Sequence, residues 1–133
     1  MSANVDLVRR LYEALEASDQ ATYRILTHPQ VAWHFAEGFP HGGTHIGHDA
    51  VFGHVFPTLM QDFSEWHIEV DELLDAGNAV VGLGRYRGRA RATGREVVAA
   101  FAHVFRVRDG TIVQVQQFTD TVQFARALAR RTR

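Results

Sequence analysis

Residues 95–119, REVVAAFAHVFRVRDGTIVQVQQFT, hold the pattern that decides the fold. Apolar and polar side chains alternate on both sides of Asp109-Gly110, a dipeptide that favours a two-residue turn between antiparallel strands. The stretch therefore predicts a hairpin of two long strands.

The same two-residue period continues from this hairpin towards the N-terminus. Residues 79–92 read as a further long strand, which a turn at Thr93-Gly94 joins to the hairpin. A fourth strand begins at Glu65 and ends before a turn at Gly77-Asn78. Strands much longer than the usual length of roughly five or six residues twist and curl, so these four antiparallel strands predict a half-barrel.

The first part of the chain has helical periodicity instead. Residues 4–17 carry apolar side chains at three- and four-residue steps, and we expect Asn4 to cap this helix. Ser18-Asp19 ends it and begins a second, short helix that runs to Leu26.

A short strand, a loop and a third helix separate these helices from the long strands. The strand covers residues 31–35, and a glycine-rich loop covers residues 37–47. Residues 48–60 predict a helix with Pro57 in its interior, where proline bends or breaks a helix. A short helix or ordered tail is expected over residues 120–129.

Helices early in a chain and strands late in it are typical of an α+β fold. The length of 133 residues matches one ordinary domain. We therefore expect a single domain over residues 1–133, in which a curved antiparallel sheet wraps around the N-terminal helices as a half-barrel.

Composition excludes several kinds of chemistry. The chain has no cysteine, and all 14 of its basic residues are arginines, so thiol nucleophiles, iron–sulfur clusters and lysine Schiff bases are excluded. The net charge of −1 argues against binding to nucleic acid. Neither a signal segment nor a membrane-spanning stretch is visible, so we expect a cytoplasmic protein that binds neither nucleic acid nor membranes.

Two polar residues of the quoted hairpin are candidates for chemistry. His103 shares a strand face with Phe101 and Phe105, so it lies either in the core or in the wall of an apolar pocket, as a hydrogen-bond donor or an acid/base. Gln117 lies on the apolar face of the last strand and is expected to be a buried polar group with a partner.

Tyr86 shares its strand face with the three glycines at positions 82, 84 and 88. These glycines either form the floor of a cavity or let the sheet curve strongly against a helix, and the two interpretations are compatible. We expect Tyr86 to line an apolar cavity together with Trp33, Phe35, Phe39, Phe52, Phe56, Met60, Trp66 and Phe101.

Other polar residues lie close to this expected cavity in the sequence. His34 lies on the opposite strand face from Trp33, near the expected mouth. Asp120 follows the last strand, where its carboxylate is suited to cap the C-terminal helix. The histidines of the glycine-rich segment have spacings of four and three residues, but in a loop we expect a solvated rim and neither a metal nor a cofactor; they are His41, His45 and His48.

Taken in order, these segments resemble the NTF2-like superfamily, specifically its SnoaL-like and ketosteroid-isomerase-like branch. The similarity covers nearly the whole chain and lies in residues 8–15, 18–19, 46–51, 84–88, 92–95, 101–113 and 117–121. It implies a cone-shaped α+β barrel, a deep apolar pocket between the helices and the sheet, and a homodimer that forms through the sheet.

The resemblance also implies roles for particular residues. In the isomerase branch, a tyrosine on the first helix and an acid on a late strand donate to an oxyanion, and an aspartate on the first strand is the base. These positions match Tyr12, His103 and Phe35, which is next to His34. The aspartate base is therefore missing, and the acid of the SnoaL-type cyclases is replaced by Gln117.

Three hypotheses follow. A cofactor-independent enzyme would act on a hydrophobic carbonyl compound; Tyr12 and His103 would stabilise an enolate-like oxygen, and His34 or, as a weaker candidate, Asp120 would be the base. A non-catalytic protein of the same fold would bind a hydrophobic small molecule, as the missing carboxylates favour. A dimeric interaction module would use the outer sheet face, which carries alternating arginines at positions 85, 87, 89 and 91.

Overall fold

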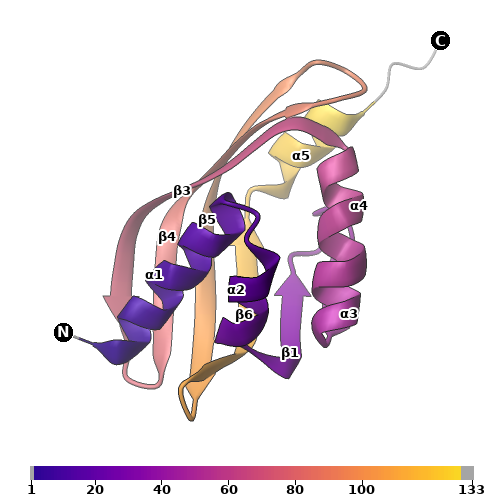
Figure 1. The fold of residues 1–133 in the computed structure, drawn as a ribbon. Helices are drawn as coiled ribbons and strands as arrows, with labels where there is room; N and C mark the ends of the chain where they lie inside the picture. The colour runs from indigo at the N-terminus through magenta and orange to yellow at the C-terminus, as the bar shows by residue number, and fades with distance from the viewer. Residues whose placement is uncertain (1, 130–133) are drawn as a thin grey trace.

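Helices cover one face of a curved six-stranded sheet in the computed structural model, which describes residues 2–129 (Figure 1). In chain order, the elements are α1 Ala3–Glu16, α2 Gln20–Leu26, β1 Thr27–Phe35, β2 Gly43–Ile46, α3 His48–Ala50, a π-helical turn η1 Val51–Val55, α4 Phe56–Gln61, β3 Phe63–Asp75, β4 Ala79–Ala90, β5 Glu96–Arg108, β6 Thr111–Thr119 and α5 Thr121–Leu128. The α+β class and the curved half-barrel are confirmed.

The sheet has the strand order β2-β1-β6-β5-β4-β3. The four long strands are antiparallel neighbours, as expected. The expectation of a loop over residues 37–47 is wrong in part, because β2 lies within it and pairs with β1. β1 in turn pairs in parallel with β6, about 80 residues later in the chain, a pairing that local periodicity does not specify.

The turns of the sheet follow the sequence closely. Asp109 and Gly110 both have positive φ angles, of 52° and 77°, as the two-residue turn predicted between β5 and β6 requires. Gly77 likewise has a positive φ of 83° in the turn between β3 and β4. These turns require positive φ angles, which Gly and Asp adopt more readily than most residues. The hairpins were therefore predictable from the sequence.

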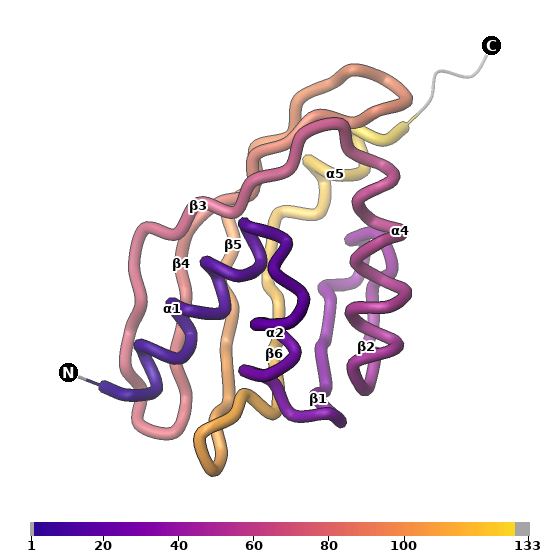
Figure 2. Tube along the Cα trace, in the orientation of Figure 1, coloured from indigo at the N-terminus to yellow at the C-terminus, as the bar shows by residue number. Residues whose placement is uncertain are grey.

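The N-terminal helices lie on the concave side of the sheet (Figures 1 and 2). The predicted cap of α1 is wrong by two residues: the hydroxyl of Ser2, not Asn4, accepts a hydrogen bond from the backbone N–H of Val5. The predicted start of α2 is confirmed, because the Asp19 carboxylate accepts from the N–H of Thr22. No helix of residues 2–129 is long and apolar enough to cross a membrane.

The predicted helix over residues 48–60 is continuous but changes its winding at η1. The N–H of Phe56 donates to the carbonyl of Val51, five residues earlier, as in a π-helix. Pro57, which has no N–H to donate, lies in the first turn of α4, directly after this widened turn. The chain thus accommodates Pro57 with one widened turn instead of a break.

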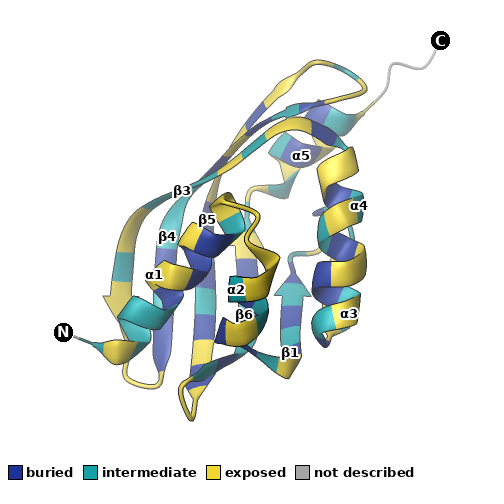
Figure 3. Ribbon diagram, viewed as in Figure 1, coloured by how far each residue is buried: buried dark blue, intermediate teal, exposed yellow. Residues whose placement is uncertain are grey.

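Burial alternates along the long strands, which separates the two faces of the sheet (Figure 3). On the outer face, Arg85, Arg87 and Arg89 pair with carboxylates of β3 at N···O distances of 2.8 to 3.2 Å. Large apolar side chains are also exposed there, namely Val98 and Phe118. The arginine stripe is therefore largely neutralised by its neighbours, which removes the observation that favoured an interaction module.

Candidate functional site

A cavity of about 200 Å³ lies between the concave sheet face and the helices. Its wall is mainly aromatic and aliphatic. The structure brings together ten residues predicted for the site: Trp33, Phe35, Phe39, Phe52, Phe56, Met60, Trp66, Tyr86, His103 and Gln117. They come from β1, the loop after it, η1, α4 and the inner positions of β3 to β6. The cavity thus depends on the curvature that brings these elements around one space.

The mouth of the cavity is marked by lining residues that are themselves exposed. These are Ser18 and Gln20 at the turn between α1 and α2, and Pro57 and Met60 on α4. The opposite, inner end is formed by the buried side chains of Tyr86, His103 and Gln117.

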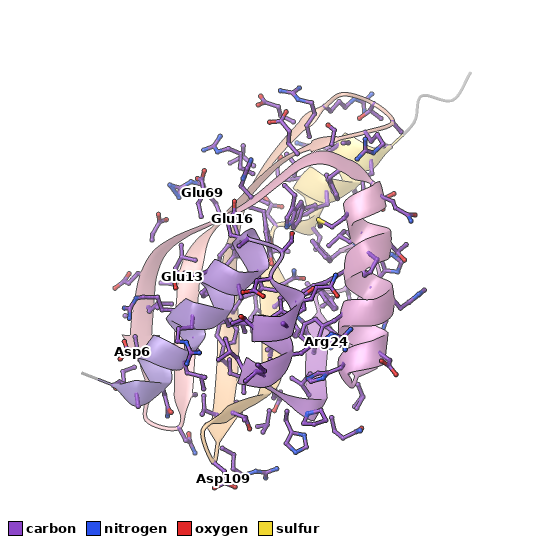
Figure 4. All side chains as sticks on the ribbon, in the orientation of Figure 1. Asp6, Glu13, Glu16, Arg24, Glu69 and Asp109 are labelled. Carbon is purple, nitrogen blue, oxygen red and sulfur yellow. The ribbon has the colours of Figure 1, made fainter. Side chains whose placement is uncertain are left out.

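Glu16 fixes one side of this mouth. Its carboxylate accepts from the backbone N–H of Ile68, a cavity-lining residue of β3, and contacts Nδ1 of His67 at 2.9 Å. This hydrogen bond from His67 to Glu16 raises the pKa of His67. The labelled carboxylates, Glu16 among them, lie on the surface of the molecule and not in the cavity wall (Figure 4).

A chain of hydrogen bonds closes the inner end. The hydroxyl of Tyr12 lies 2.7 Å from Nδ1 of His103, and the hydroxyl of Tyr86 lies 2.6 Å from Nε2 of the same ring. Gln117 Nε2 donates to the Tyr86 hydroxyl at 2.8 Å, and Gln117 Oε1 accepts from the N–H of Ala36 at 3.1 Å. All four side chains in this network are buried.

The direction of these bonds follows from Tyr12. Within residues 2–129, the only hydrogen-bond partner of its hydroxyl is Nδ1 of His103. If Nδ1 were the donor, the Tyr12 proton would be buried without an acceptor, which is costly. The opposite tautomer would satisfy Tyr86 and leave Tyr12 unpaired, but Tyr86 lines the cavity, where a ligand can accept its proton, and Tyr12 does not. We therefore assign the proton of the neutral His103 ring to Nε2, which donates to Tyr86, and we assign Tyr12 as the donor to Nδ1.

In this assignment, the Tyr86 hydroxyl proton has no acceptor within the described residues. Its oxygen accepts from both His103 and Gln117, so both lone pairs are occupied. His103 and Gln117 both line the cavity, which places this hydroxyl at the cavity wall. Its own O–H then has no acceptor among residues 2–129, and a group inside the cavity can supply one.

The network carries no charge near neutral pH. Burial lowers the pKa of His103 to about 3, because the imidazolium would be desolvated. Burial also raises the pKa of Tyr12 and of Tyr86 above that of an ordinary tyrosine. The inner end thus offers neutral hydrogen-bond donors and no titratable base.

Two of the glycines on the face of Tyr86 allow close packing and do not form the floor of the cavity. A Cβ at position 82 would overlap the Tyr12 hydroxyl, and one at position 84 would overlap the backbone of Glu69 and Val70 in β3. Gly82 therefore lets Tyr12 reach His103, and Gly84 lets the strands approach closely. The interpretation as sheet curvature against a helix agrees with the structure, whereas the space beside Gly82 is filled.

Four predicted site residues lie outside the cavity wall. Tyr12 reaches only the far side of His103, and Phe101 stacks on the His103 ring in the core. His34 points to the other strand face and contacts the hydroxyl of Thr44 at 2.9 Å, because alternation separates it from Trp33 and Phe35. Asp120 is exposed; it holds the N-cap position of α5 without a capping hydrogen bond, and its carboxylate accepts from the side chain of Gln123.

Seven lining residues were missed by the sequence reasoning: Leu15, Ser18, Gln20, Tyr23, Pro57, Leu59 and Ile68. Tyr23 is the most informative of them. It is buried on α2, packs on Phe52 at a ring distance of 4.5 Å, and its pKa is raised, chiefly by burial. An aromatic residue on the inner side of a short amphipathic helix was the available signal.

Metal ligands are not gathered in this region. Residues 2–129 contain no group of three or more His, Asp or Glu side chains placed to hold a metal ion. His45 contacts the carbonyl of His41 at 2.8 Å, and His48 contacts Thr27, so these histidines bond to separate neighbours.

Comparison with solved structures reveals close similarity of fold. An NTF2-like protein from Burkholderia thailandensis is 35% identical, with a TM-score of 0.92, over 98% of this chain and 100% of that chain. An NTF2-like protein of unknown function from Burkholderia pseudomallei is 30% identical, with a TM-score of 0.90, over 98% and 100% of the two chains. TerC, co-crystallised with polyporic acid, is 23% identical with a TM-score of 0.86 over 96% and 98%, which shows the fold alone.

No curated protein matches the sequence. The family model for the SnoaL-like domain matches residues 8–115, which is most of the chain and includes every lining residue of the cavity except Gln117. The chain therefore belongs to the SnoaL-like branch of the NTF2-like superfamily.

Proposed function

We propose that this protein binds an apolar small molecule in its cavity and polarises a carbonyl oxygen of that molecule through the Tyr86 hydroxyl. The observation that carries the proposal is the free O–H of Tyr86 at the buried end of an otherwise apolar space. Ligand sites commonly combine an apolar wall with a few polar groups that fix orientation.

The size of the cavity limits what it can enclose. An apolar cavity of about 150 Å³ is enough for benzene. The 200 Å³ here therefore fits one aromatic or alicyclic ring with a small fused or attached group. Larger ligands would extend past Met60 and Gln20 through the mouth. TerC supports this proposal in that a protein of this fold was crystallised with the small molecule polyporic acid.

Tyr86 is well arranged to act on a carbonyl group. The two hydrogen bonds that its oxygen accepts polarise the O–H and make it a stronger donor. A hydrogen bond from a dry, fixed donor stabilises the negative charge that develops on a carbonyl oxygen during enolisation. Tyr12 contributes indirectly, because it fixes the His103 tautomer that leaves the Tyr86 proton free.

The base of an acid/base mechanism is not among the lining residues. The residues that line the cavity within positions 2–129 include no Asp or Glu, and both ring nitrogens of His103 are engaged. Binding with polarisation is therefore the function that the geometry supports best. Acid/base catalysis of the SnoaL or ketosteroid-isomerase type is a second candidate, favoured by the Tyr86 donor, with water or a group of the substrate as the base.

Fluorescence titration tests the binding. Both tryptophans of the chain, Trp33 and Trp66, line the cavity, so their emission reports on a ligand there. We expect 1-indanone to bind, and Tyr86→Phe to weaken it about tenfold, the loss of one good hydrogen bond. Indane lacks the oxygen, so its affinity should not change. Tyr23→Phe is the matched control, since it removes another cavity hydroxyl. Failure of 1-indanone to bind contradicts the proposal.

Proton exchange separates the two candidates. An enzyme of this type would exchange the hydrogens next to the carbonyl of 1-indanone for deuterium in D₂O, which proton NMR detects. In that case Tyr86→Phe should slow the exchange by on the order of a hundredfold. An exchange rate equal to that in buffer, with binding intact, leaves the function of a non-catalytic binding protein.

We propose further that a second copy of this chain covers the outer sheet face. Phe118 is 52% exposed and Val98 44% exposed on the outer face of neighbouring strands, and large exposed apolar groups on one face are typical of an interface. Light scattering of the wild type should give twice the chain mass of 15.0 kDa. Phe118→Asp should shift the protein to the monomer, whereas a monomeric wild type would contradict the assembly.

A further inference from the structure

We infer that the ligand of this cavity presents two separate hydrogen-bond acceptors and no donor to the inner end, one acceptor for Tyr86 and the other for Gln117. This inference rests on the proposed binding function and adds the chemical class: a dicarbonyl or quinone-like compound rather than a simple ketone or a hydroxylated one. Gln117 becomes the residue that determines this preference.

The orientation of the Gln117 amide is fixed by two neighbours. Its Oε1 accepts from the backbone N–H of Ala36 at 3.1 Å, so the NH₂ group must be on the other side. There, Nε2 donates to the Tyr86 hydroxyl at 2.8 Å. Reversing the amide would place its NH₂ against the N–H of Ala36 and leave both donors without an acceptor.

One N–H of Gln117 remains without a partner. An amide Nε2 carries two protons, and Tyr86 takes one of them. Within residues 2–129, Nε2 makes no second hydrogen bond, although the side chain is only 2% exposed. Because Gln117 lines the cavity, this remaining N–H is available to a ligand there. A buried amide proton without an acceptor is unfavourable, so a ligand that supplies one is preferred.

The two free donors reach different atoms. The two N–H bonds of a planar amide diverge, and one of them already points to the Tyr86 oxygen. The other N–H therefore points away from Tyr86 and cannot reach an oxygen that the Tyr86 O–H binds. A ligand that satisfies both donors needs two acceptors, on separate atoms.

Few acceptors remain at this end of the cavity. The lone pairs of Tyr86 are taken by His103 and Gln117, Nδ1 of His103 is taken by Tyr12, and one of the two lone pairs of Gln117 Oε1 is taken by the N–H of Ala36. A ligand hydroxyl or amine placed here would lose its hydrogen bonds to water and find at most the second lone pair of Gln117 Oε1 in return. Sites with such unpaired buried groups discriminate strongly between closely related ligands.

Three probes with one two-ring skeleton test the inference. 1-Tetralone carries one carbonyl, 1,4-naphthoquinone carries two, and 4-hydroxy-1-tetralone replaces the second carbonyl by a hydroxyl. The chain has neither cysteine nor lysine for the quinone to modify. Isothermal titration should show the quinone binding at least about fivefold more tightly than 1-tetralone, from one added hydrogen bond, and the hydroxy ketone no more tightly than 1-tetralone.

Substitution of Gln117 locates the effect. Gln117→Met keeps the length of the side chain and removes both amide donors, so the preference for the quinone over 1-tetralone should disappear. Gln116→Met, on the opposite face of β6, is the matched control and should keep that preference. Near-UV circular dichroism and thermal unfolding establish that each variant is folded.

The outcomes distinguish the two proposals. If none of the three probes binds the wild-type protein, the proposed function fails and this inference fails with it. If 1-tetralone binds and the quinone binds no more tightly, or if Gln117→Met keeps the full preference, the two-acceptor inference alone is overturned. Loss of the preference in folded Gln117→Met, with retention in Gln116→Met, supports it.

Discussion

Two tyrosines bond to the same imidazole of His103 from opposite sides, in different surroundings. Tyr12 bonds to Nδ1 in a space closed by Gly82, and it has no other hydrogen-bond partner within residues 2–129. Tyr86 bonds to Nε2 at the cavity wall, where Gln117 also donates to it. The proton of the Tyr12 hydroxyl is used inside the protein, and the Tyr86 hydroxyl keeps its proton for a ligand.

The two surroundings predict different effects for deletions within one network. A deletion on the Tyr12 side should lower stability, and one on the Tyr86 side should lower ligand affinity. On the closed side, the buried Tyr12 hydroxyl packs against Gly82, and we expect a deletion there to cost folding free energy. On the cavity side, water or a ligand can replace a lost partner, so a deletion costs affinity instead. The substitutions below test this division, in order of decreasing effect on the free energy of unfolding, and the pH dependence of the wild type is tested beside them.

His103→Phe should have the largest effect, because it removes the partner that both tyrosines share. We expect the free energy of unfolding to fall by roughly 2–5 kcal/mol, since each buried group left unpaired costs about 1–3 kcal/mol. Urea denaturation measures this change. A loss below about 0.5 kcal/mol, the range of ordinary surface substitutions, would show that the network does not stabilise the fold.

Tyr12→Phe should destabilise the protein by about 1–3 kcal/mol, because the buried Nδ1 of His103 loses its only donor among residues 2–129. Affinity for 1-indanone should fall less than in Tyr86→Phe, since the variant alters the ligand donor only through the His103 tautomer. Denaturation and fluorescence titration of the same sample give both values. An affinity loss larger than that of Tyr86→Phe would place Tyr12, not Tyr86, against the ligand.

Acid should destabilise the wild type through His103. Its folded pKa of about 3 lies below the ordinary value of 6.5, so between these pH values the unfolded chain binds a proton that the folded chain does not. The contribution is fully present above pH 6.5 and is lost as the pH falls towards 3, at up to about 1.4 kcal/mol per pH unit. Denaturation of wild type and His103→Gln across this range should show a shallower slope for the variant; equal slopes contradict a neutral, buried His103.

Tyr86→Phe should reduce the free energy of unfolding by only about 0.5–1.5 kcal/mol, because the donors left by Tyr86 face the cavity, where water can accept from them. Its main effect should be the loss of affinity described above. Thermal unfolding measures the loss of stability, and fluorescence titration of the same variant measures the loss of affinity for 1-indanone. A stability loss equal to that of Tyr12→Phe would mean that the cavity side is as dry as the closed side.

His34→Ala should have the smallest effect, within about 0.5 kcal/mol, because its contact with Thr44 is exposed and lies outside the cavity. Affinity for 1-indanone and any exchange at its α-carbon should match those of the wild type. A large loss of exchange in this variant would restore His34 as the base and overturn its placement on the outer face.

Much of the fold was predictable from the sequence, because turns and helix ends depend on residues that are close together in the chain. Asp109, Gly110 and Gly77 specified their turns through positive φ angles, and Asp19 specified the start of α2 through its carboxylate. The strand β2 and the parallel pairing of β1 with β6 could not be read, because a parallel partner is chosen by distant contacts.

The candidate site was predictable to the extent that strand alternation decides which side a residue faces. Alternation placed His103 and Gln117 inward and His34 outward, and the aromatic residues of β1, η1 and α4 did line one cavity. Alternation could not tell which of Tyr12 and Tyr86 faces the cavity, because both bond to His103. The path of α1 over Gly82 decides that Tyr12 lies on the side of His103 away from the cavity.

The sequence by itself determined the α+β class, the two-residue turns, the absence of thiol and lysine chemistry, and the set of aromatic and polar residues that form the cavity wall. Each of these follows from residue type or from the period of a strand or helix. Tertiary structure alone decided which tyrosine donates to His103, which one faces the cavity, and that the amide of Gln117 keeps a free N–H. A hydrogen bond joins residues that are distant in the chain, so its direction is set only when curvature and packing bring all its partners together.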